Sequence, residues 1–565
     1  MLITLAEQYE LAATESEMEW FKDAKFGIFV HWGPALSVTS VLSWGRDGER
    51  PAANKPANGG VPAEIYDRQY LKFNPVDFDA DKWMRQVRAF GASYLVFTAK
   101  HHDGFCLFDA PNTDYDVMST PYGRDIAAEI AEAAHRHGIK LFWYYSQPDW
   151  THPDCLREDH YASYLPYMKE QVEHLYTNYG RIDGVFWDGL ASKYWQWDAY
   201  RLMRSMKEWQ PGIISNPRGG FSWPDNSRRG DYDTPEQSLG PVNHGRYWEA
   251  CLTMTDKWLY SPGGTVKPAE TILGMLSQVV GNGGNLLLNF GPDGRGNFVE
   301  AEATQGARVG EWLDQYGHTL YGTRRGIYIG GDWGASTQRN DTLFLHVLQQ
   351  FGDGVDPVIS LPELPVDIRE ITGVTSGLMA YETANGQLRL TFDSEDFASH
   401  LDNIVMVVLE ESPEKHDRIP TWSAEPLTNA DLEVSASSVR APNRRPEQLY
   451  QTSAEVFSEG IRLKNWWQPS PDDPDPSLTL TFPQPEPIVT LLLSENMRAH
   501  NVRQFVIEGR VSGQDWQSVY EGRTIGEGLR VGLSGQPLEA IRLRVTAGEG
   551  TPQITAFNVY AAGSK

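Results

Sequence analysis

Residues 124–146 read RDIAAEIAEAAHRHGIKLFWYYS, and this stretch decides the fold class. Ile126, Ile130 and Ala134 recur at helical spacing, and Gly138 is a residue type that commonly ends a helix. The apolar run IKLFWYYS (139–146) follows directly, and its length and aromatic content are typical of a strand covered on both faces. A helix joined to a buried strand is the repeating unit of a parallel α/β sheet.

The same alternation extends to both sides of this unit. A second helical pattern spans residues 159–180, and further buried-strand runs occupy residues 25–33, 93–104, 182–190, 212–218, 247–254 and 285–293. The sequence therefore predicts a (β/α)₈-like barrel within residues 1–325. Seven strands are evident and the eighth is not, so we expect the barrel to close irregularly.

The pattern changes after about residue 325. Short β-type runs such as TLFLHVL (342–348), NIVMVVLE (403–410) and IVTLLLSE (488–495) alternate with Pro, Gly, Asn and Asp, and no long amphipathic helix follows. This arrangement predicts β-sandwich structure. A region rich in Pro and Asp near residues 411–430 predicts a division into two domains, residues 326–427 and 428–565.

Composition and charge exclude several classes of partner. The formal net charge is −26, and no basic block offers the clustered cations that nucleic acid requires. No run approaches transmembrane length, and the segment MLITLAEQYELAATESEMEW (1–20) lacks the pattern of a signal peptide. We therefore expect no membrane partner, and a cytoplasmic protein or a secreted or periplasmic one whose signal peptide has been removed. The sequence does not predict an oligomeric state.

Aromatic and sulfur-containing residues add two further indications. The chain holds 19 Trp, 25 Tyr and 22 Phe, which suits stacking on sugar rings and equally suits large cores. Cys106, Cys155 and Cys251 are odd in number and far apart, so they imply no disulfide framework.

Chemically capable side chains gather where the predicted strands end. In a barrel of parallel strands, the carboxyl ends of the strands and the following loops carry the functional residues. Histidines, carboxylates, an arginine and aromatic residues occupy these positions: His31, His101, His102, Tyr144, Phe186, Asp188, Arg218, Asp231, Asp233, Glu236 and Glu249. A sugar pocket needs this mixture of hydrogen-bonding groups, aromatic walls and two carboxylates.

Each group also has a structural interpretation. Asp188 could cap the next helix, and Arg218 could serve a structural ion pair. The His101–His102 pair could ligate a metal ion. Neighbouring strand residues point to opposite faces, however, and no third potential ligand occurs at a sequence spacing that is typical of metal sites. We therefore predict no metal and no cofactor.

Six ordered motifs carry a resemblance to a known family. They are WFKDAKFGIFVHWG (20–33), YLVFTAKHHDGFCLF (94–108), YYSQPDW (144–150), FWDG (186–189), YWEACLTMTDKW (247–258) and GNGGNLLLNFGP (281–292). Together they closely resemble the α-L-fucosidases of glycoside hydrolase family twenty-nine. The resemblance implies a retaining, exo-acting hydrolase that removes terminal α-L-fucose from oligosaccharides or glycoconjugates through a fucosyl-enzyme intermediate, without a cofactor.

The resemblance also implies roles for matching positions. Asp188 matches the family's nucleophile, and His31, His101 and His102 match residues that hold the sugar hydroxyls. Tyr144, Phe186 and Arg218 match residues that line the pocket.

The acid/base is less consistently placed in this family. Glu236 in DYDTPEQ (231–237) is the closest match, whereas Glu249 is the second contender or a substrate-orienting group. Many relatives carry a Glu-Trp-Tyr motif where this chain has Glu64-Ile65-Tyr66, so we expect Trp44 to supply the missing aromatic wall.

The last segment and the choice of substrate leave further alternatives open. Residues 428–565, with NWWQPSPDDPDPSLTLTF (465–482), FVIEGRVSGQDWQSVYEG (505–522), AIRLRV (540–545) and ITAFNVY (554–560), resemble a discoidin-like carbohydrate-binding module. Such a module either binds sugar or only packs against the barrel. The alternative functions are hydrolysis of a related α-L-galactoside or 6-deoxyhexoside, and fucose binding without catalysis.

Overall fold

The chain folds into two compact units. The computed structural model describes residues 11–49, 60–157, 161–189, 197–219, 230–239, 246–331, 333–352, 354–375, 377–400, 402–421, 427, 432–441, 444–446, 466–496 and 501–562. The first unit comprises residues 1–240, 244–266 and 284–322, and the second comprises residues 241–243, 267–283 and 323–565.

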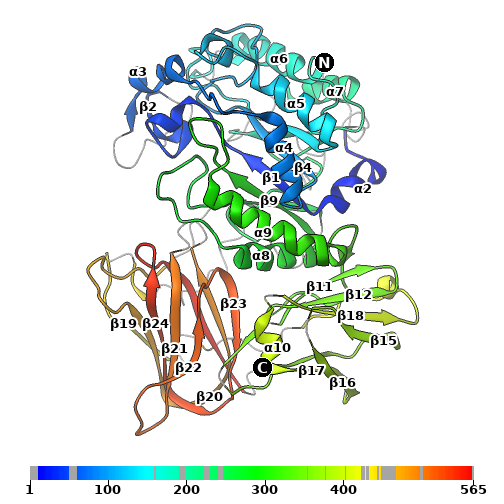
Figure 1. The fold of residues 1–565 in the computed structure, drawn as a ribbon, viewed down its shortest axis with the longest axis vertical. Coiled ribbons are helices and arrows are strands. Elements are labelled where there is room, and N and C mark those ends of the chain that lie inside the picture. Colours follow the sequence, from blue (N-terminus) through cyan, green and yellow to red (C-terminus); the bar gives the residue numbers. More distant parts are fainter. Residues whose placement is uncertain are drawn as a thin grey trace. The chain divides into compact units, whose positions relative to one another are not determined.

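A parallel sheet of seven strands organises the first unit (Figure 1). Its strands run in the spatial order β7 (Ile214–Ser215), β6 (Gly184–Asp188), β5 (Lys140–Ser146), β4 (Tyr94–Lys100), β1 (Phe26–Val30), β9 (Gly284–Phe290) and β8 (Trp248–Thr253). Every neighbouring pair is parallel. Six of the seven strands fall within the runs that the sequence predicted, and β9 begins one residue before its run. The two short strands β2 (Arg46–Asp47) and β3 (Val61–Pro62) pair outside this sheet.

Residues 231–237 bridge the two edges of the sheet. The amide of Asp231 donates to the carbonyl of Ser215 at the end of β7, over 2.7 Å. Further along, Asp233 and Glu236 form parallel bridges with Trp248 and Cys251 of β8. The sheet thereby becomes a nearly closed barrel, whose eighth position is an irregular segment and not a regular strand. This agrees with the expectation of irregular closure.

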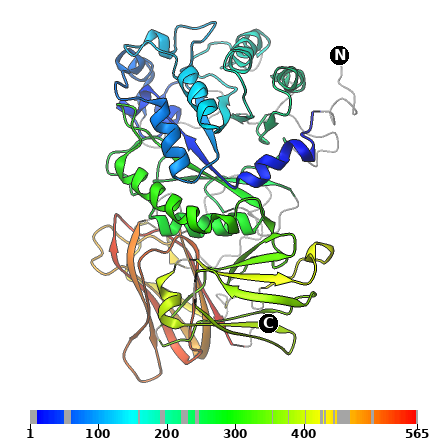
Figure 2. The ribbon, with the colours of Figure 1, turned by 45° about the vertical axis from the view of Figure 1, so that its right-hand side comes forward.

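Helices cover the outside of this sheet (Figures 1 and 2). They are α4 (Ala80–Ala89), α5 (Ile126–His137), α6 (Tyr161–Thr177), α7 (Ala199–Trp209) and α9 (Glu300–Tyr316). The short α3 (Ala63–Tyr66) lies beside β2 and β3, and α2 (Glu15–Ala24) precedes β1. The predicted helix over residues 124–138 is confirmed as α5. The side chain of Asp125 accepts from the Ala128 amide to cap its start, and Gly138 ends it at φ 65°.

Large apolar side chains fill the inside of the barrel. Phe29, Tyr94, Phe142, Tyr144 and Phe186 belong to one buried cluster, to which α2 also contributes. Phe21 of α2 packs against Tyr94 and Phe142, which stand near the amino ends of β4 and β5. The amino end of the barrel is therefore plugged by apolar contacts, and the polar strand ends lie at the opposite, carboxyl end.

The second unit is rich in β-structure. A five-stranded antiparallel sheet contains β10 (Arg324–Arg325), β11 (Gly334–Arg339), β12 (Thr342–Val347), β18 (Asn403–Leu409) and β15 (Ile368–Gly373). A three-stranded sheet contains β14 (Val358–Pro362), β17 (Gln387–Phe392) and β16 (Leu378–Ala384). The helices of this unit in the described residues are α8 (Ala269–Gly281) and the short α10 (Ser394–Ser399).

A third set of strands occupies the carboxyl-terminal part. It contains β13 (Gln350–Phe351), β19 (Glu433–Ala436), β20 (Ser477–Glu495), β21 (Val502–Arg510), β22 (Gln517–Gly522), β23 (Glu527–Gly532), β24 (Pro537–Gly548) and β25 (Ile554–Ala561). The first half of β20 pairs with β19 and β24, and its second half pairs with β23 and β25. The predicted order of an α/β region followed by a β-rich region is confirmed. Within the described residues, no helix is both long and apolar enough to span a bilayer.

Candidate active site

Asp188 is the last residue of β6 and the centre of a polar cluster. Its Oδ2 accepts a hydrogen bond of 2.8 Å from the hydroxyl of Tyr144, which stands on the neighbouring strand β5. Its Oδ1 accepts a bond of 3.0 Å from Nη1 of Arg218. Nε2 of His102 lies 3.9 Å from Oδ2. The Asp188 side chain keeps 23% of its surface exposed, so a substrate can reach it.

Arg218 connects the two carboxylates that the sequence singled out. While Nη1 bonds to Asp188, Nη2 donates to Oε2 of Glu236 over 3.2 Å and to the carbonyl of Thr234 over 3.3 Å. The guanidinium also lies 5.6 Å from the ring centroid of Phe186. One planar cation therefore holds both carboxylates at the same end of the barrel, as a guanidinium with several donors can do.

Opposing influences act on the ionisation of Asp188. Burial raises the pKa of this carboxyl, but the positive charge of Arg218 and the hydrogen bonds from Tyr144 and Arg218 lower it to about 2. Asp188 is therefore a carboxylate across the ordinary pH range. A permanently ionised, partly exposed carboxylate suits a nucleophile better than an acid.

His31, His101 and His102 lie together beside Asp188. The ring centroids of His31 and His101 are 5.8 Å apart, and those of His101 and His102 are 4.1 Å apart. The expectation that neighbouring residues 101 and 102 face opposite sides is wrong, because both follow the end of β4. A register shift between Thr98 and Lys100 re-aims the chain at this point.

Aromatic rings form the walls of this cluster. Tyr144 stacks on Phe186 with centroids 5.8 Å apart and on His101 at 5.5 Å. Trp44 is 43% exposed and meets the rings of His102 and Trp150 edge-on, at 5.5 and 5.1 Å. Trp44 thus presents an exposed ring beside His102, and its role as an aromatic wall stays a prediction.

Glu249 does not join this cluster. It is the second residue of β8, is fully buried, and accepts a hydrogen bond from the hydroxyl of Tyr94 at the amino end of β4. Burial raises the pKa of Glu249 to about 8, and its Oε1 meets no hydrogen-bond partner among the residues that the structure describes. The expectation that Glu249 stands with the substrate-binding residues is not met, because a residue at the start of a barrel strand lies at the amino end.

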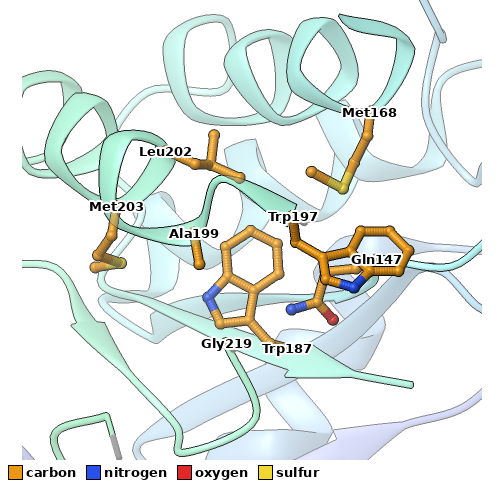
Figure 3. A pocket seen from close by; sticks show the side chains of 8 residues that line it. All are labelled: Gln147, Met168, Trp187, Trp197, Ala199, Leu202, Met203 and Gly219. Atoms are coloured by element: carbon orange, nitrogen blue, oxygen red, sulfur yellow. The ribbon is translucent and has the colours of Figure 1, made fainter. Parts of the chain in front are cut away.

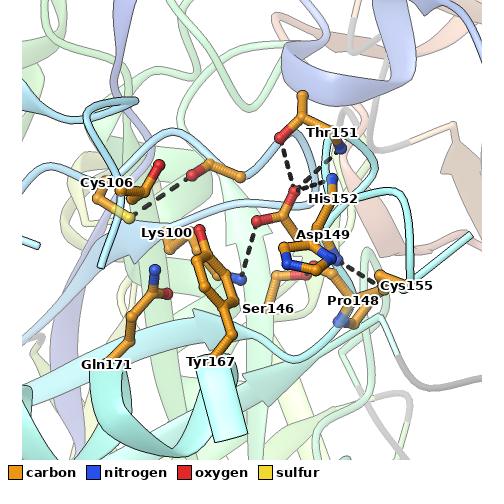
Figure 4. Close-up of polar contacts among 12 residues, drawn as sticks. Lys100, Cys106, Ser146, Pro148, Asp149, Thr151, His152, Cys155, Tyr167 and Gln171 are labelled. Atoms are coloured by element: carbon orange, nitrogen blue, oxygen red, sulfur yellow. Dashed lines mark hydrogen bonds and ion pairs between the residues drawn. The ribbon is translucent and has the colours of Figure 1, made fainter. Parts of the chain in front are cut away.

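Lys100 and Asp149 form a buried ion pair (Figure 4). Nζ of Lys100 lies 3.8 Å from Oδ2 of Asp149, and both side chains are at most 1% exposed. Oδ1 of Asp149 accepts hydrogen bonds from the amides of Thr151 and His152 and from the Thr151 hydroxyl. The amide of Trp150 donates to the carbonyl of His102 over 2.7 Å. The pair therefore lies behind the site and links its two loops.

A small apolar pocket lies on the other side of β6 (Figure 3). It is lined by Gln147, Met168, Trp187, Trp197, Ala199, Leu202, Met203 and Gly219. Trp187 precedes Asp188 on the strand and points to the opposite face, toward the helices α6 and α7. This pocket is therefore separate from the polar cluster.

The paired histidines His101 and His102 are the candidate metal ligands of this site. Among the residues that the structure describes, no group of three or more His, Cys, Asp or Glu side chains is arranged to hold a metal ion. The three cysteines are unpaired and buried.

Comparison with known proteins identifies the family. The sequence model described as alpha-L-fucosidase matches residues 5–318, more than half of the chain. The chain belongs to the alpha-L-fucosidase family. It is therefore a glycoside hydrolase, and the resemblance of the sequence to the alpha-L-fucosidases is confirmed.

Relatives with known names or structures agree with this assignment. The tissue alpha-L-fucosidase of Mus musculus is 27% identical over 353 residues, which cover 57% of this chain and 74% of that protein. Alpha-L-fucosidase isoenzyme 1 from Paenibacillus thiaminolyticus superposes with a TM-score of 0.62 at 29% identity, covering 70% of this chain and 99% of that one. The alpha-L-fucosidase from Vibrio sp. strain EJY3 shares 19% identity and a TM-score of 0.62 over 97% of this chain and 99% of its own, so the two share the fold.

Several residues at the site were not singled out from the sequence. Ser43, Ser146 and Asn289 each bond to one of the three histidines, and Trp258 packs against His31 with centroids 5.0 Å apart. Ser146 and Asn289 are the last and second-last residues of β5 and β9, so their places at strand ends were a usable signal. Ser43 lies in an irregular loop and offered no such signal.

Proposed function

We propose that this alpha-L-fucosidase removes terminal α-L-fucose by double displacement, with Asp188 as nucleophile and Glu236 as acid/base. The observation that carries the proposal is the contact of both carboxylates with the one guanidinium of Arg218. A retaining glycosidase needs two carboxyl groups close enough to act on the same glycosidic bond.

In the first step, Asp188 attacks the anomeric carbon while Glu236 donates a proton to the departing glycosidic oxygen. A fucosyl ester on Asp188 results, and the aglycone leaves as an alcohol. In the second step, Glu236 takes a proton from water, which attacks the same carbon and releases fucose with its original configuration. Arg218 and Tyr144 keep Asp188 ionised and oriented before the first step, and they stabilise the carboxylate that the second step releases.

The remaining groups of the cluster suit the rest of the sugar. His31, His101 and His102 would bind hydroxyls, and Trp44 would cover the entrance. Phe186 is only 1% exposed, because Tyr144 and Arg218 cover it. Trp258 is partly exposed beside His31 and is the better candidate for the apolar wall that the C5 methyl group requires.

Asp188→Gly tests the proposal with chemical rescue. The variant should fold normally and lose hydrolysis of nitrophenyl α-L-fucoside, because the side chain forms a bond and supports no core. Added azide should restore turnover and give the β-L-fucosyl azide, since azide enters from the vacated face. Near wild-type hydrolysis in the variant would rule out the assigned role.

We further propose that the β-rich unit consists of two domains, residues 326–427 and 428–565. Two separate hydrophobic clusters support this division, one drawn from residues 327–409 and the other from residues 432–561. The resemblance of residues 428–565 to a discoidin-like module makes fucosylated glycans its candidate ligand. Binding of the Asp188→Gly protein to immobilised glycans, with the barrel site saturated by fucose, would test that role.

A further inference from the structure

Each of the three histidines at the site is held through its Nδ1 atom by a polar side chain from elsewhere in the barrel. Nδ1 of His31 lies 2.6 Å from Oδ1 of Asn289, Nδ1 of His101 lies 2.6 Å from Oγ of Ser43, and Nδ1 of His102 lies 2.7 Å from Oγ of Ser146. All six side chains are buried. Because one ring nitrogen of a neutral histidine donates and the other accepts, the bond at Nδ1 determines what Nε2 offers to a substrate.

Asn289 fixes the state of His31. Its Nδ2 donates to the backbone carbonyl of Trp258 over 2.8 Å, and a carbonyl can only accept, so Oδ1 must be the atom that faces His31. Nδ1 of His31 therefore carries the hydrogen. Burial lowers the pKa of His31 to about 4, so the ring is neutral near pH 7 and its Nε2 is an acceptor.

Ser146 fixes His102 in the same way. The Ser146 hydroxyl donates to the carbonyl of Pro148 over 2.9 Å, which uses its only hydrogen. Toward His102 the hydroxyl can only accept, so Nδ1 of His102 donates. In the neutral ring, Nε2 is then an acceptor that stands 3.9 Å from Oδ2 of Asp188, too far for a direct hydrogen bond.

Ser43 has the opposite effect on His101. Its Oγ accepts from the amide of Asp103 over 2.8 Å. The Ser43 hydroxyl also interacts with the side chains of Asp103 and Tyr66, and Nδ1 of His101 is the acceptor that lies 2.6 Å from it. The hydrogen of the hydroxyl is thus directed to that nitrogen, and the ring hydrogen of neutral His101 resides on Nε2. Burial lowers the pKa of His101 well below its ordinary value, which keeps the ring neutral.

We propose that Asn289, Ser43 and Ser146 are positioning residues that set the tautomers of His31, His101 and His102, so that the pocket offers two unprotonated ring nitrogens and one ring N–H. The inference rests on the proposed function, because it specifies how that same site selects its sugar. Two sugar hydroxyls must donate to His31 and His102, and one must accept from His101. A ligand with an ether or fluorine at either donating position loses a bond.

The acceptor on His102 has a particular use in the reaction. Because His102 lies beside Asp188, the hydroxyl that donates to it is the one on the carbon next to the anomeric centre, the 2-hydroxyl. Positive charge develops on the ring in the transition state and makes that hydroxyl a stronger donor. The bond to His102 therefore strengthens as the reaction proceeds, and it raises kcat more than it lowers KM.

The tautomers can be measured without any activity. In protein labelled with ¹⁵N at histidine, protonated and unprotonated ring nitrogens differ widely in chemical shift, and single histidine variants assign the signals. We expect His31 and His102 to carry hydrogen on Nδ1 and His101 to carry it on Nε2. Ser146→Ala should remove the fixed tautomer of His102 alone, and Ser146→Thr should restore it. A hydrogen on Nε2 of neutral His102, or on Nδ1 of His101, would overturn the assignment.

Kinetics with deoxygenated substrates test the consequence. Ser146→Ala should lower kcat about tenfold on nitrophenyl α-L-fucoside, with little change in KM. A tenfold loss in kcat is the magnitude expected for one hydrogen bond. On the 2-deoxy analogue the same substitution should have almost no effect, and comparing variant with wild type on one substrate cancels the analogue's intrinsic reactivity. Ser277→Ala, which removes a buried serine of the β-rich unit that bonds to Asp402, is the matched control.

The outcomes separate this inference from the proposed function. An equal loss on fucoside and on its 2-, 3- and 4-deoxy analogues would mean that Ser146 is merely structural, and would overturn the inference while Asp188 remains the nucleophile. If Asp188→Gly kept full activity, the proposed function would be wrong. The NMR measurement on the free protein would still test the three tautomers independently of that result.

Discussion

Nη1 of Arg218 donates a hydrogen bond of 3.0 Å to Oδ1 of Asp188, in a pair that is about three-quarters buried. An arginine in this position lowers the pKa of the carboxyl, and here the pKa of Asp188 falls to about 2 although burial alone would raise it. Asp188 therefore stays ionised as the pH falls from neutrality until about pH 2. The acid limb of the activity profile should consequently not come from this group.

Arg218→Met removes that positive charge. The pKa of Asp188 should rise, so that the acid limb of kcat/KM moves to higher pH, and kcat/KM at neutral pH should fall on the order of 10²-fold. Arg218→Lys keeps the charge but not the paired donors, so its acid limb should move less. A profile from Arg218→Met that runs parallel to the wild-type profile would show that Arg218 does not govern the ionisation of Asp188.

Glu236→Ala should discriminate between leaving groups. A general acid contributes roughly 10²–10⁴-fold, and most where the leaving group is poor. The variant should therefore lose far more activity on fucosylated oligosaccharides than on aryl fucosides with acidic leaving groups. Azide should speed breakdown of its fucosyl-enzyme and yield the α-L-fucosyl azide. If Glu249→Ala shows this pattern while Glu236→Ala resembles wild type, the two roles must be exchanged.

Glu249 should affect stability and not the chemical step. Burial raises its pKa from 4.5 to about 8 in the folded protein, so the folded state holds the proton after the unfolded state has released it. The contribution of Glu249 is fully present below pH 4.5, and the free energy of unfolding falls as the pH rises to about 8, by at most roughly 5 kcal/mol.

Glu249→Gln removes this titration and keeps an acceptor for Tyr94. The variant should match wild type in urea unfolding below pH 4.5 and exceed it in stability above pH 8, while kcat changes little. Stability curves of variant and wild type that stay parallel over this range would contradict a buried neutral Glu249.

The ion pair of Lys100 and Asp149 should be coupled strongly. Lys100→Met leaves Asp149 buried without its cation, which typically costs about 3–5 kcal/mol of stability. Adding Asp149→Asn removes the unpaired charge and keeps an oxygen for the amides of Thr151 and His152, so the double variant should be more stable than Lys100→Met alone. Urea unfolding of the two single variants and the double variant measures this coupling, and strictly additive losses would contradict it.

The sequence predicted much of the barrel because its units are strongly periodic. The helix α5 and the strand β5 follow from apolar spacing and from Asp125 and Gly138 at the helix ends. The closing segment, residues 231–237, was not predicted as part of the barrel, because it pairs through backbone bonds and carries no apolar run.

The sequence could predict those site residues whose location follows from their position along a strand. Asp188 ends β6 and His31 follows β1, so both were expected at the carboxyl end. The prediction that Glu249 lies with the substrate-binding residues was wrong because Glu249 comes early in the run 247–254. The second residue of a barrel strand lies near the amino end of that strand. The side chains of His101 and His102 were misjudged because a register shift in β4 is not visible in the residue pattern.

Trapping the covalent intermediate tests the central claim most directly. A 2-deoxy-2-fluoro-α-L-fucosyl donor with a good leaving group should form the ester quickly and hydrolyse it slowly, because fluorine destabilises both transition states. Peptide mass spectrometry of the inactivated protein should then find one 2-deoxy-2-fluorofucosyl group, on Asp188. A label on Glu236, Glu249 or any other residue would contradict the account.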